Sequence, residues 1–284
     1  MKTFFLVAWI FLFSLTFNAQ DKMPESQWAT LDKARIHYYD IGSKKNKTAI
    51  VFVHGWACNA DFWKNSLNAF PQNRVIALDL IGHGQSDRPN AIYSMDLFAK
   101  SVDAVLTKAK VEKAILVGHS MGTPVARQFY RLYPNKTAAI VIVDGALRPY
   151  MSKSEFDQFM APLRSSYVQN AGKFINGMTQ PISDGTLKTW IGEQMMMTRA
   201  TVALSAMDAM NDQTIWSNDK INVPVLAVMA ESATWPADTE EFYKTIAPDL
   251  SFKMWKNVSH FLMMEKPAEF NGEVKAFISQ KALL

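Results

Sequence analysis

One short stretch limits the folds open to this chain more than any other. A β-branched and aliphatic run at residues 114–117 ends in Gly-His-Ser-Met-Gly at residues 118–122, and the apolar residues of 126–132 then recur at helical spacing. This order predicts a strand, a sharp turn and a helix. In such a turn Ser120 takes a strained backbone conformation, so glycines are needed where a Cβ would strike a neighbouring element. We therefore expect Ser120 at a helix N-terminus, where free N–H groups favour developing negative charge.

The motif by itself leaves two interpretations open. Only three of its five positions are fixed, and a glycine-rich turn between a strand and a helix occurs in many parallel sheets without any chemistry. The context favours a nucleophile, because a strand precedes the motif, a helix follows it and a single late histidine, His260, follows the last predicted strand.

Length and composition restrict the class of protein. The 284 residues, 49% of them hydrophobic, can form one large α/β domain or two small ones with a full core. The formal charge of +4 is mild and the basic residues are scattered, so nucleic acid is not expected as a partner. The sequence contains no repeat that would indicate a solenoid.

The first segment predicts export. Residues 1–20 have a positive start, an apolar middle too short for a comfortable membrane span, and a polar end, which is typical of a secretory signal peptide cleaved near Ala19 or Gln20. We expect a periplasmic or secreted protein without stable membrane insertion after cleavage. The bulky Phe17 leaves an uncleaved anchor as the alternative. The single cysteine, Cys58, cannot form an intrachain disulfide and is interpreted as a small packing residue.

Apolar runs and turn signals predict the remaining elements. Ser94 can cap a helix that runs to about Ala109. His37 alternates with apolar neighbours and is expected to be a surface strand residue, not a catalyst. The strands are predicted at residues 28–31, 34–39, 49–53, 74–80, 139–143, 223–229 and 250–255. Further helices are expected around residues 62–67 and 242–244 and from about residue 265.

The alternation of strands and helices is interrupted once. Between residues 148 and 222 the pattern is mostly helical and rich in methionine. We therefore predict a core of residues 21–147 and 223–284 that is divided by a helical insertion at 148–222. Methionines fit irregular apolar surfaces, so some of them could contact a substrate, although most are expected to pack the insertion itself.

From Ile36 to the C-terminus the chain resembles the α/β-hydrolase family, in its serine carboxylesterase-like branch. The resemblance rests on the Ser120 motif, on Phe-Val-His-Gly-Trp at residues 52–56, on a Gly-x-Gly-x-Ser-Asp loop at 82–87 and on Glu-x-Pro-x-x-Phe at 265–270. It implies a mostly parallel, doubly wound sheet with the insertion as a helical lid.

The same resemblance implies a set of site residues. Ser120 would be the nucleophile and His260 the base, while the backbone N–H groups of Trp56 and Met121 would form an oxyanion hole. A serine hydroxyl needs a base to take its proton, and an imidazole with an ordinary pKa of ~6.5 can accept and return it. A carboxylate is then needed to orient that imidazole.

The carboxylate is the point at which the sequence departs from the family. The usual position, in the turn after the strand at residues 223–229, contains no aspartate. Three candidates remain: Asp144 at the end of the preceding strand, Glu231 just beyond the usual strand, and Asp238 further along. We favour Asp144, because a carboxylate at the C-terminal end of a parallel strand points into the same rim as the other groups.

The predicted function is that of a serine hydrolase that cleaves carboxylic esters with small or medium apolar acyl groups. The irregular acid leaves a ligand-binding or low-activity homologue as the alternative, and lactones, thioesters and peroxyacid formation also fit an acyl-serine route. Neither a metal-ligand spacing nor a phosphate-binding loop is present in the sequence, so no cofactor is expected. An apolar pocket could draw on any of Trp56, Trp63, Trp190, Trp216 and Trp235, and the substrate-binding residues and oligomeric state are left unassigned.

Overall fold

The chain folds around an eight-stranded sheet. The computed structural model describes residues 23–149 and 151–284, so the predicted signal peptide lies outside the described residues and stays a prediction. The strand order is β1-β2-β4-β3-β5-β6-β7-β8. β1 and β2 are antiparallel to their neighbours, and β3 to β8 are parallel. The strands are β1 Gln27–Leu31, β2 Ala34–Ile41, β3 Thr48–Val53, β4 Arg74–Leu78, β5 Lys113–His119, β6 Thr137–Val143, β7 Val225–Ala230 and β8 Leu250–Trp255.

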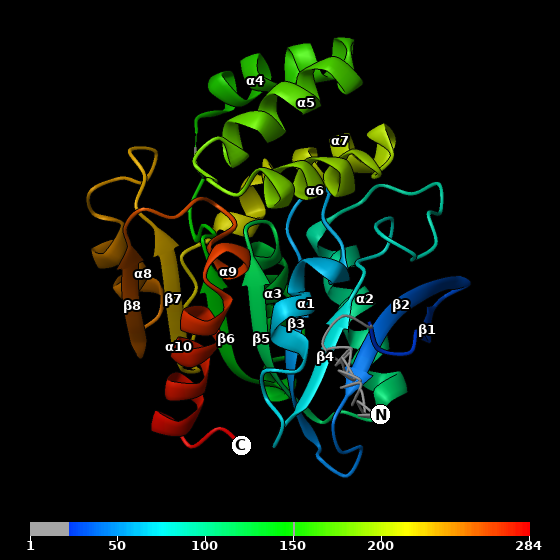
Figure 1. The fold of residues 1–284 in the computed structure, drawn as a ribbon, viewed down its shortest axis with the longest axis vertical. Coiled ribbons are helices and arrows are strands. Elements are labelled where there is room, and N and C mark those ends of the chain that lie inside the picture. The colour runs from blue at the N-terminus through cyan, green and yellow to red at the C-terminus, as the bar shows by residue number, and fades with distance from the viewer. Residues whose placement is uncertain (1–22, 150) are drawn as a thin grey trace, which may run out of the picture.

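Helices cover both faces of this sheet, which confirms the predicted doubly wound arrangement. α1 and α10 lie in front of it in Figure 1, and α2 and α3 lie behind it. The helices are α1 Lys64–Leu67, α2 Met95–Ala109, α3 Gly122–Leu132, α4 Lys153–Ser165, α5 Tyr167–Thr179, α6 Gly185–Met196, α7 Ala200–Met210, α8 Thr239–Ile246, α9 Leu262–Glu265 and α10 Pro267–Gln280. None of the helices in the described ranges combines the length and the apolar character needed to cross a membrane.

The central strands are buried along their length, which explains their uninterrupted apolar sequences. Every residue of β4 and β7 is buried, and so are all but the first residues of β3 and β5. A strand that is covered on both faces has no solvent side, so it does not alternate. The predicted cap of α2 is also present, since the Ser94 side chain accepts a hydrogen bond from the Leu97 N–H.

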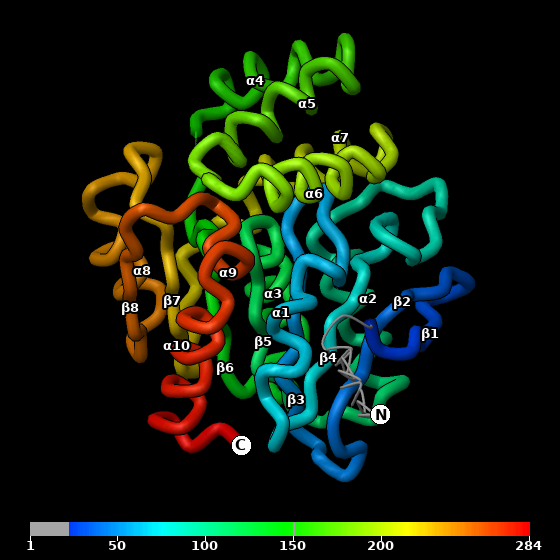
Figure 2. The backbone as a smooth tube through the Cα atoms, in the orientation of Figure 1, coloured from blue at the N-terminus to red at the C-terminus, as the bar shows by residue number. Residues whose placement is uncertain are grey.

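Four helices, α4 to α7, are inserted between β6 and β7. They lie across the ends of the strands, with α6 and α7 nearer the sheet and α4 and α5 outside them (Figure 2). Arg127 of α3 connects the two ends of this insertion, because its guanidinium donates to the Leu147 carbonyl at 3.0 Å and pairs with Asp219 at 3.3 Å. Burial lowers the pKa of Arg127 to about 10. The insertion is thereby fixed to the helix that begins beside Ser120.

One sequence prediction about the sheet is wrong. His37 in β2 is not at the surface: its side chain is fully buried, and its Nδ1 lies 2.8 Å from Asp79 Oδ2. The ring packs edge-on against Trp28 and Tyr39. Alternation along a strand predicts a solvent-facing side only where nothing covers that side, and here a loop and a neighbouring strand cover it.

Candidate active site

Ser120 occupies a tight turn between β5 and α3. Its φ is 51°, in the left-handed region, and its N–H donates to the Val143 carbonyl at 2.9 Å. A Cβ at Gly118 would lie 2.3 Å from the Gly122 carbonyl oxygen, and one at Gly122 would lie 2.3 Å from the Val53 carbonyl oxygen. Both glycines are therefore required by close backbone approach, as the motif predicted.

His260 and Asp144 are brought together by the fold. His260 follows β8, Asp144 follows β6, and the distance from His260 Nδ1 to Asp144 Oδ2 is 2.6 Å. The histidine is partly accessible, with 21% of its side chain exposed, whereas 6% of the Asp144 side chain is exposed. A carboxylate at Nδ1 leaves Nε2 as the nitrogen that can accept a proton.

The second oxygen of Asp144 is held by the segment after β7. Asp144 Oδ1 accepts the Ala230 N–H at 2.9 Å and the Trp235 indole N–H at 3.2 Å. Both bonds come from the stretch in which the family usually carries its acid. The carboxylate therefore follows β6, whereas the N–H groups that orient it lie at the end of β7 and in the segment after it.

Neither alternative acid contacts His260 in the structure. The carboxylate of Glu231 pairs with Lys256 at 3.7 Å, and that of Asp238 pairs with the Arg148 guanidinium. Because Asp144 alone of the three candidates is bonded to the imidazole, the geometry favours it.

The turn after β3 lies beside Ser120. A Cβ placed on Gly55 would be 2.9 Å from His119 Nδ1 and 3.1 Å from the Ser120 Cβ, so a side chain there would press against the segment that carries Ser120. Within the described part of the chain, the backbone N–H groups of Trp56 and Met121 donate no hydrogen bond. Met121 is the N-cap of α3, and its side chain is buried away from the cavity described below.

His119 supports the loop that carries His260. Its Nε2 lies 2.8 Å from the His260 carbonyl oxygen, and the two rings are 4.6 Å apart. Since the carbonyl can only accept, Nε2 of His119 carries the proton. Burial, and then the neighbouring His260, hold the pKa of His119 well below its ordinary value. The ring therefore stays neutral, so it does not oppose a positive charge on His260. The sequence motif contains His119, but it gave no signal of this contact.

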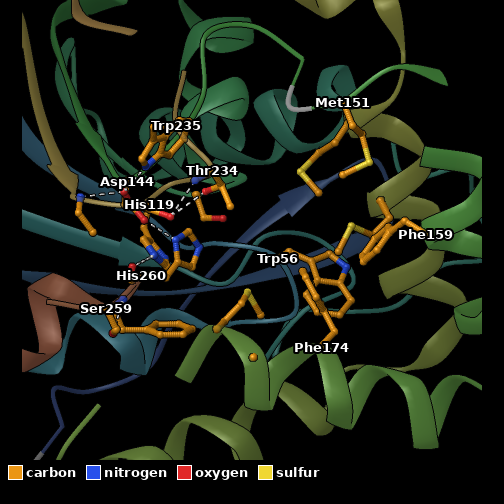
Figure 3. Close-up of a pocket in the computed structure, with 18 of the residues that line it drawn as sticks. Trp56, His119, Asp144, Met151, Phe159, Phe174, Thr234, Trp235, Ser259 and His260 are labelled. Atoms are coloured by element: carbon orange, nitrogen blue, oxygen red, sulfur yellow. Dashed lines mark hydrogen bonds and ion pairs between the residues drawn. The ribbon is translucent and has the colours of Figure 1, made fainter. Parts of the chain in front are cut away.

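These groups open onto one large cavity of about 760 Å³. Ser120, Asp144, His119 and His260 all line it. Figure 3 shows the cluster of Asp144, His119 and His260 on one side and Trp56, Phe159 and Phe174 on the other. The apolar wall is supplied largely by the helical insertion and consists of Met151, Phe156, Phe159, Phe174, Met178, Met195, Met207, Met210 and Trp216.

Among the described residues, no hydrogen bond joins Ser120 to His260, although both line the cavity. In unliganded enzymes such bonds are often long and shorten only when a substrate is bound. Asp144 and His260 are thus already paired, and Ser120 lines the same cavity.

The tryptophans named from the sequence fall into two groups. Trp56, Trp216 and Trp235 line the cavity. Trp63 instead packs against Phe52 in the core, with ring centroids 4.8 Å apart, and Trp190 packs against Phe62. Among the methionines of the insertion, Met195, Met207 and Met210 line the cavity, whereas Met197 is exposed.

Cys58 is buried, in agreement with the packing role predicted for it, and burial raises the pKa of its thiol. A thiol held in its neutral form is a poor nucleophile. Within the part of the chain that the structure describes, His, Cys, Asp and Glu side chains form no group that could hold a metal ion.

A second set of serine, histidine and aspartate occurs at the other end of the sheet. The Ser26 hydroxyl lies 2.9 Å from His37 Nε2, and His37 Nδ1 lies 2.8 Å from Asp79 Oδ2. Burial is the largest single influence and raises the pKa of Asp79, but the hydrogen bond and charge of His37, the charge of His54 and the Gln85 N–H together outweigh it, so the pKa of this carboxyl is lowered. Neither Ser26 nor His37 lines the large cavity.

Comparisons with known proteins indicate the family to which this fold belongs. A family model described as the α/β-hydrolase fold matches residues 48–186. A non-heme chloroperoxidase of Streptomyces lividans is 30% identical over 273 residues, which cover 88% of this chain and 98% of the relative. A bifunctional esterase/perhydrolase of Acinetobacter calcoaceticus is 31% identical over 224 residues, covering 71% of this chain and 80% of the relative. A solved thermophilic esterase from Thermogutta terrifontis superposes with a TM-score of 0.79 at 19% identity, covering 90% of this chain and 99% of that one.

Proposed function

Because the chain belongs to the α/β-hydrolase family, we propose that it is a serine hydrolase that cleaves carboxylic esters through an acyl-serine intermediate. The observation that carries the proposal is the 2.6 Å contact between His260 and Asp144 at the wall of the cavity that Ser120 also lines. A hydroxyl, an oriented base and an apolar cavity are the parts that acyl transfer to serine requires.

In the proposed mechanism, the Ser120 hydroxyl attacks the ester carbonyl while His260 Nε2 takes its proton. Asp144 accepts the hydrogen bond from Nδ1, so it keeps the ring in the correct tautomer and stabilises the imidazolium. The N–H groups of Trp56 and Met121 receive the developing oxyanion. His260 then returns the proton to the leaving alcohol. Water next attacks the acyl-serine while His260 takes its proton, and His260 gives that proton to the Ser120 oxygen as the carboxylic acid leaves.

The cavity supports apolar acyl groups of small to medium size. Its volume of about 760 Å³ lies within the range of roughly 300–1,000 Å³ that small-molecule sites occupy. Its wall is formed by aromatic rings and methionines, which can adapt to flexible alkyl chains.

Perhydrolysis is a second candidate, favoured by the names of the two relatives, a chloroperoxidase and an esterase/perhydrolase. Hydrogen peroxide would attack the same acyl-serine in place of water and release a peroxyacid. Since both reactions need acylation of Ser120, one variant tests them together.

The test is burst release of nitrophenol from p-nitrophenyl butyrate. We expect a burst in the wild type, and turnover lower by a factor on the order of 10⁶ in Ser120→Ala, because nothing then accepts the acyl group. Ser26→Ala is the matched control, since it removes a serine that contacts a histidine outside the cavity, and it should retain the burst. Equal bursts from wild type and Ser120→Ala would contradict serine catalysis. Absence of a burst in the wild type itself would favour the ligand-binding alternative.

A further inference from the structure

The turn after β3 contains a backbone conformation that side chains rarely adopt. Residues 55–58 close a four-residue turn in which the Cys58 N–H donates to the Gly55 carbonyl at 3.2 Å. Ala57, the third residue, has a φ of 56°. Glycine is usual at that position, because its lack of a Cβ removes the strain. Such a conformation persists only where the surroundings hold it in place.

Two side chains from different parts of the chain hold this turn. His54 Nδ1 donates to the Gly55 carbonyl at 2.8 Å, and its Nε2 accepts the Leu80 N–H at 3.0 Å. Thr198, between α6 and α7 of the insertion, donates its hydroxyl to the Ala57 carbonyl at 3.0 Å. Thr198 is 5% exposed, so water does not compete strongly for this bond.

These bonds form a continuous relay through two peptide groups. The carbonyl of Ala57 and the N–H of Cys58 belong to one planar peptide, and the carbonyl of Gly55 and the N–H of Trp56 belong to another. Thr198 donates to the first peptide, whose Cys58 N–H donates to the second. Because each hydrogen bond polarises and orients the next, the direction and donor strength of the Trp56 N–H depend on Thr198.

We propose that Thr198 is a positioning residue that aligns the Trp56 N–H for the oxyanion. This inference rests on the proposed function and extends it: the helical insertion completes the oxyanion hole in addition to lining the cavity. Two other bonds join the insertion to the same segment, from Trp56 Nε1 to the Ala203 carbonyl at 2.8 Å and from Asn59 to Gln194 at 2.9 Å. Neither belongs to the relay, so the second provides a control.

The experiment compares Thr198→Val, which keeps the shape and removes the hydroxyl, with Thr198→Ser, which keeps the hydroxyl. With p-nitrophenyl butyrate we expect kcat to fall about tenfold in Thr198→Val while KM stays within about twofold, because the bond acts mainly in the transition state. Infrared spectra of the acyl-enzyme should show the ester carbonyl stretch at higher frequency, reporting a less polarised carbonyl. Thr198→Ser and the control Gln194→Leu should both retain the wild-type frequency and kcat within about twofold.

A second readout needs no turnover. Amide hydrogen exchange at Cys58 should be faster in Thr198→Val than in the wild type or in Thr198→Ser, because the turn is less constrained. Unchanged exchange at Cys58 would overturn the relay even if the enzyme turns over esters normally. Equal losses in Thr198→Val, Thr198→Ser and Gln194→Leu would also overturn it, since they would indicate general loosening of the insertion. A wild type that is not acylated at Ser120 would overturn the proposed function instead. The exchange rate at Cys58 would still test whether Thr198 constrains the turn, because that measurement needs no turnover.

Discussion

Two sets of serine, histidine and aspartate lie in this protein, and their hydrogen bonds differ in an unexpected way. In the set of Ser26, His37 and Asp79, both bonds are formed, at 2.9 and 2.8 Å. In the set that lines the cavity, the bond between His260 and Asp144 is formed and Ser120 is not bonded to the histidine. Judged by hydrogen bonds alone, the first set would be the better candidate.

The surroundings reverse that judgement. His37 is fully buried and lies outside the large cavity, whereas 21% of the His260 side chain is exposed. Ser120 lies in the turn just before α3 and beside the Gly55 turn, and among the described residues the Trp56 and Met121 N–H groups donate no hydrogen bond, while Ser26 precedes the edge strand β1. A proton relay supports catalysis only where a substrate can reach it and where developing charge is stabilised.

The largest expected contrast is between the two aspartates. Asp144→Asn should lower kcat by ~10⁴-fold with little change in folding, because the amide no longer holds the correct tautomer of His260. Asp79→Asn should leave kcat within a few-fold but lower the unfolding free energy by about 3 kcal/mol, because it weakens a charged and fully buried hydrogen-bond network.

Ester turnover and urea unfolding, measured on both variants, check this contrast. If folded Asp79→Asn lost turnover as strongly as Asp144→Asn, the buried set would take part in catalysis and the comparison would fail. Near-normal turnover of Asp144→Asn would transfer the role to Glu231 or Asp238.

A smaller effect is a pH dependence of the unfolding free energy, which we expect from the region around Asp79. His83 is fully buried within the electrostatic reach of Asp79, and burial is the main cause that lowers its pKa, to about 3. In the unfolded chain the pKa of His83 returns to ~6.5, so between pH 6.5 and 3 the unfolded state binds a proton that the native state excludes. Stability is therefore complete above pH 6.5 and decreases as the pH falls toward 3, by ~1.4 kcal/mol per pH unit for this histidine.

The measurement is the unfolding free energy across that pH range for the wild type and His83→Gln. The slope is the informative quantity, because the substitution itself changes stability at every pH. We expect the variant's slope to be smaller by about one proton. An unchanged slope would show that His83 titrates alike in both states.

The smallest effect is expected at the two carboxylates that were the alternatives to Asp144. Glu231→Gln and Asp238→Asn should keep kcat within about twofold, because each carboxylate pairs with a basic side chain and neither contacts His260. Steady-state rates with the same ester decide this. A decrease beyond tenfold in either variant would mean that the acid is shared or misassigned, which would sharpen the account of Asp144.

The parts of the site that the sequence predicted depend on local geometry. Gly118 and Gly122 are needed by backbone atoms within a few residues of Ser120 or in the adjacent strand, so the requirement is visible as a short motif. His260 was placed by the strand before it and the helical pattern after it. The order of strands and helices followed from apolar runs, whose cause is burial on both faces of the sheet.

The carboxylate that contacts His260 was harder to predict, because sequence position and spatial position differ. Asp144 follows β6, while Ala230 and Trp235, which orient it, follow β7. Only the adjacency of β6 and β7 in the sheet brings them together. A pattern centred on residues 230–236 could show that an aspartate is missing there, but not which neighbouring strand end supplies one.

By itself, the sequence determined the turn that carries Ser120, the place of His260 after the last strand and the doubly wound sheet, because each is encoded by residues close together along the chain. Tertiary structure alone decided that His37 is buried against Asp79, that Thr198 reaches Ala57 and which tryptophans line the cavity. Each of these depends on two segments far apart in sequence packing at one place, and residue spacing contains no record of such contacts.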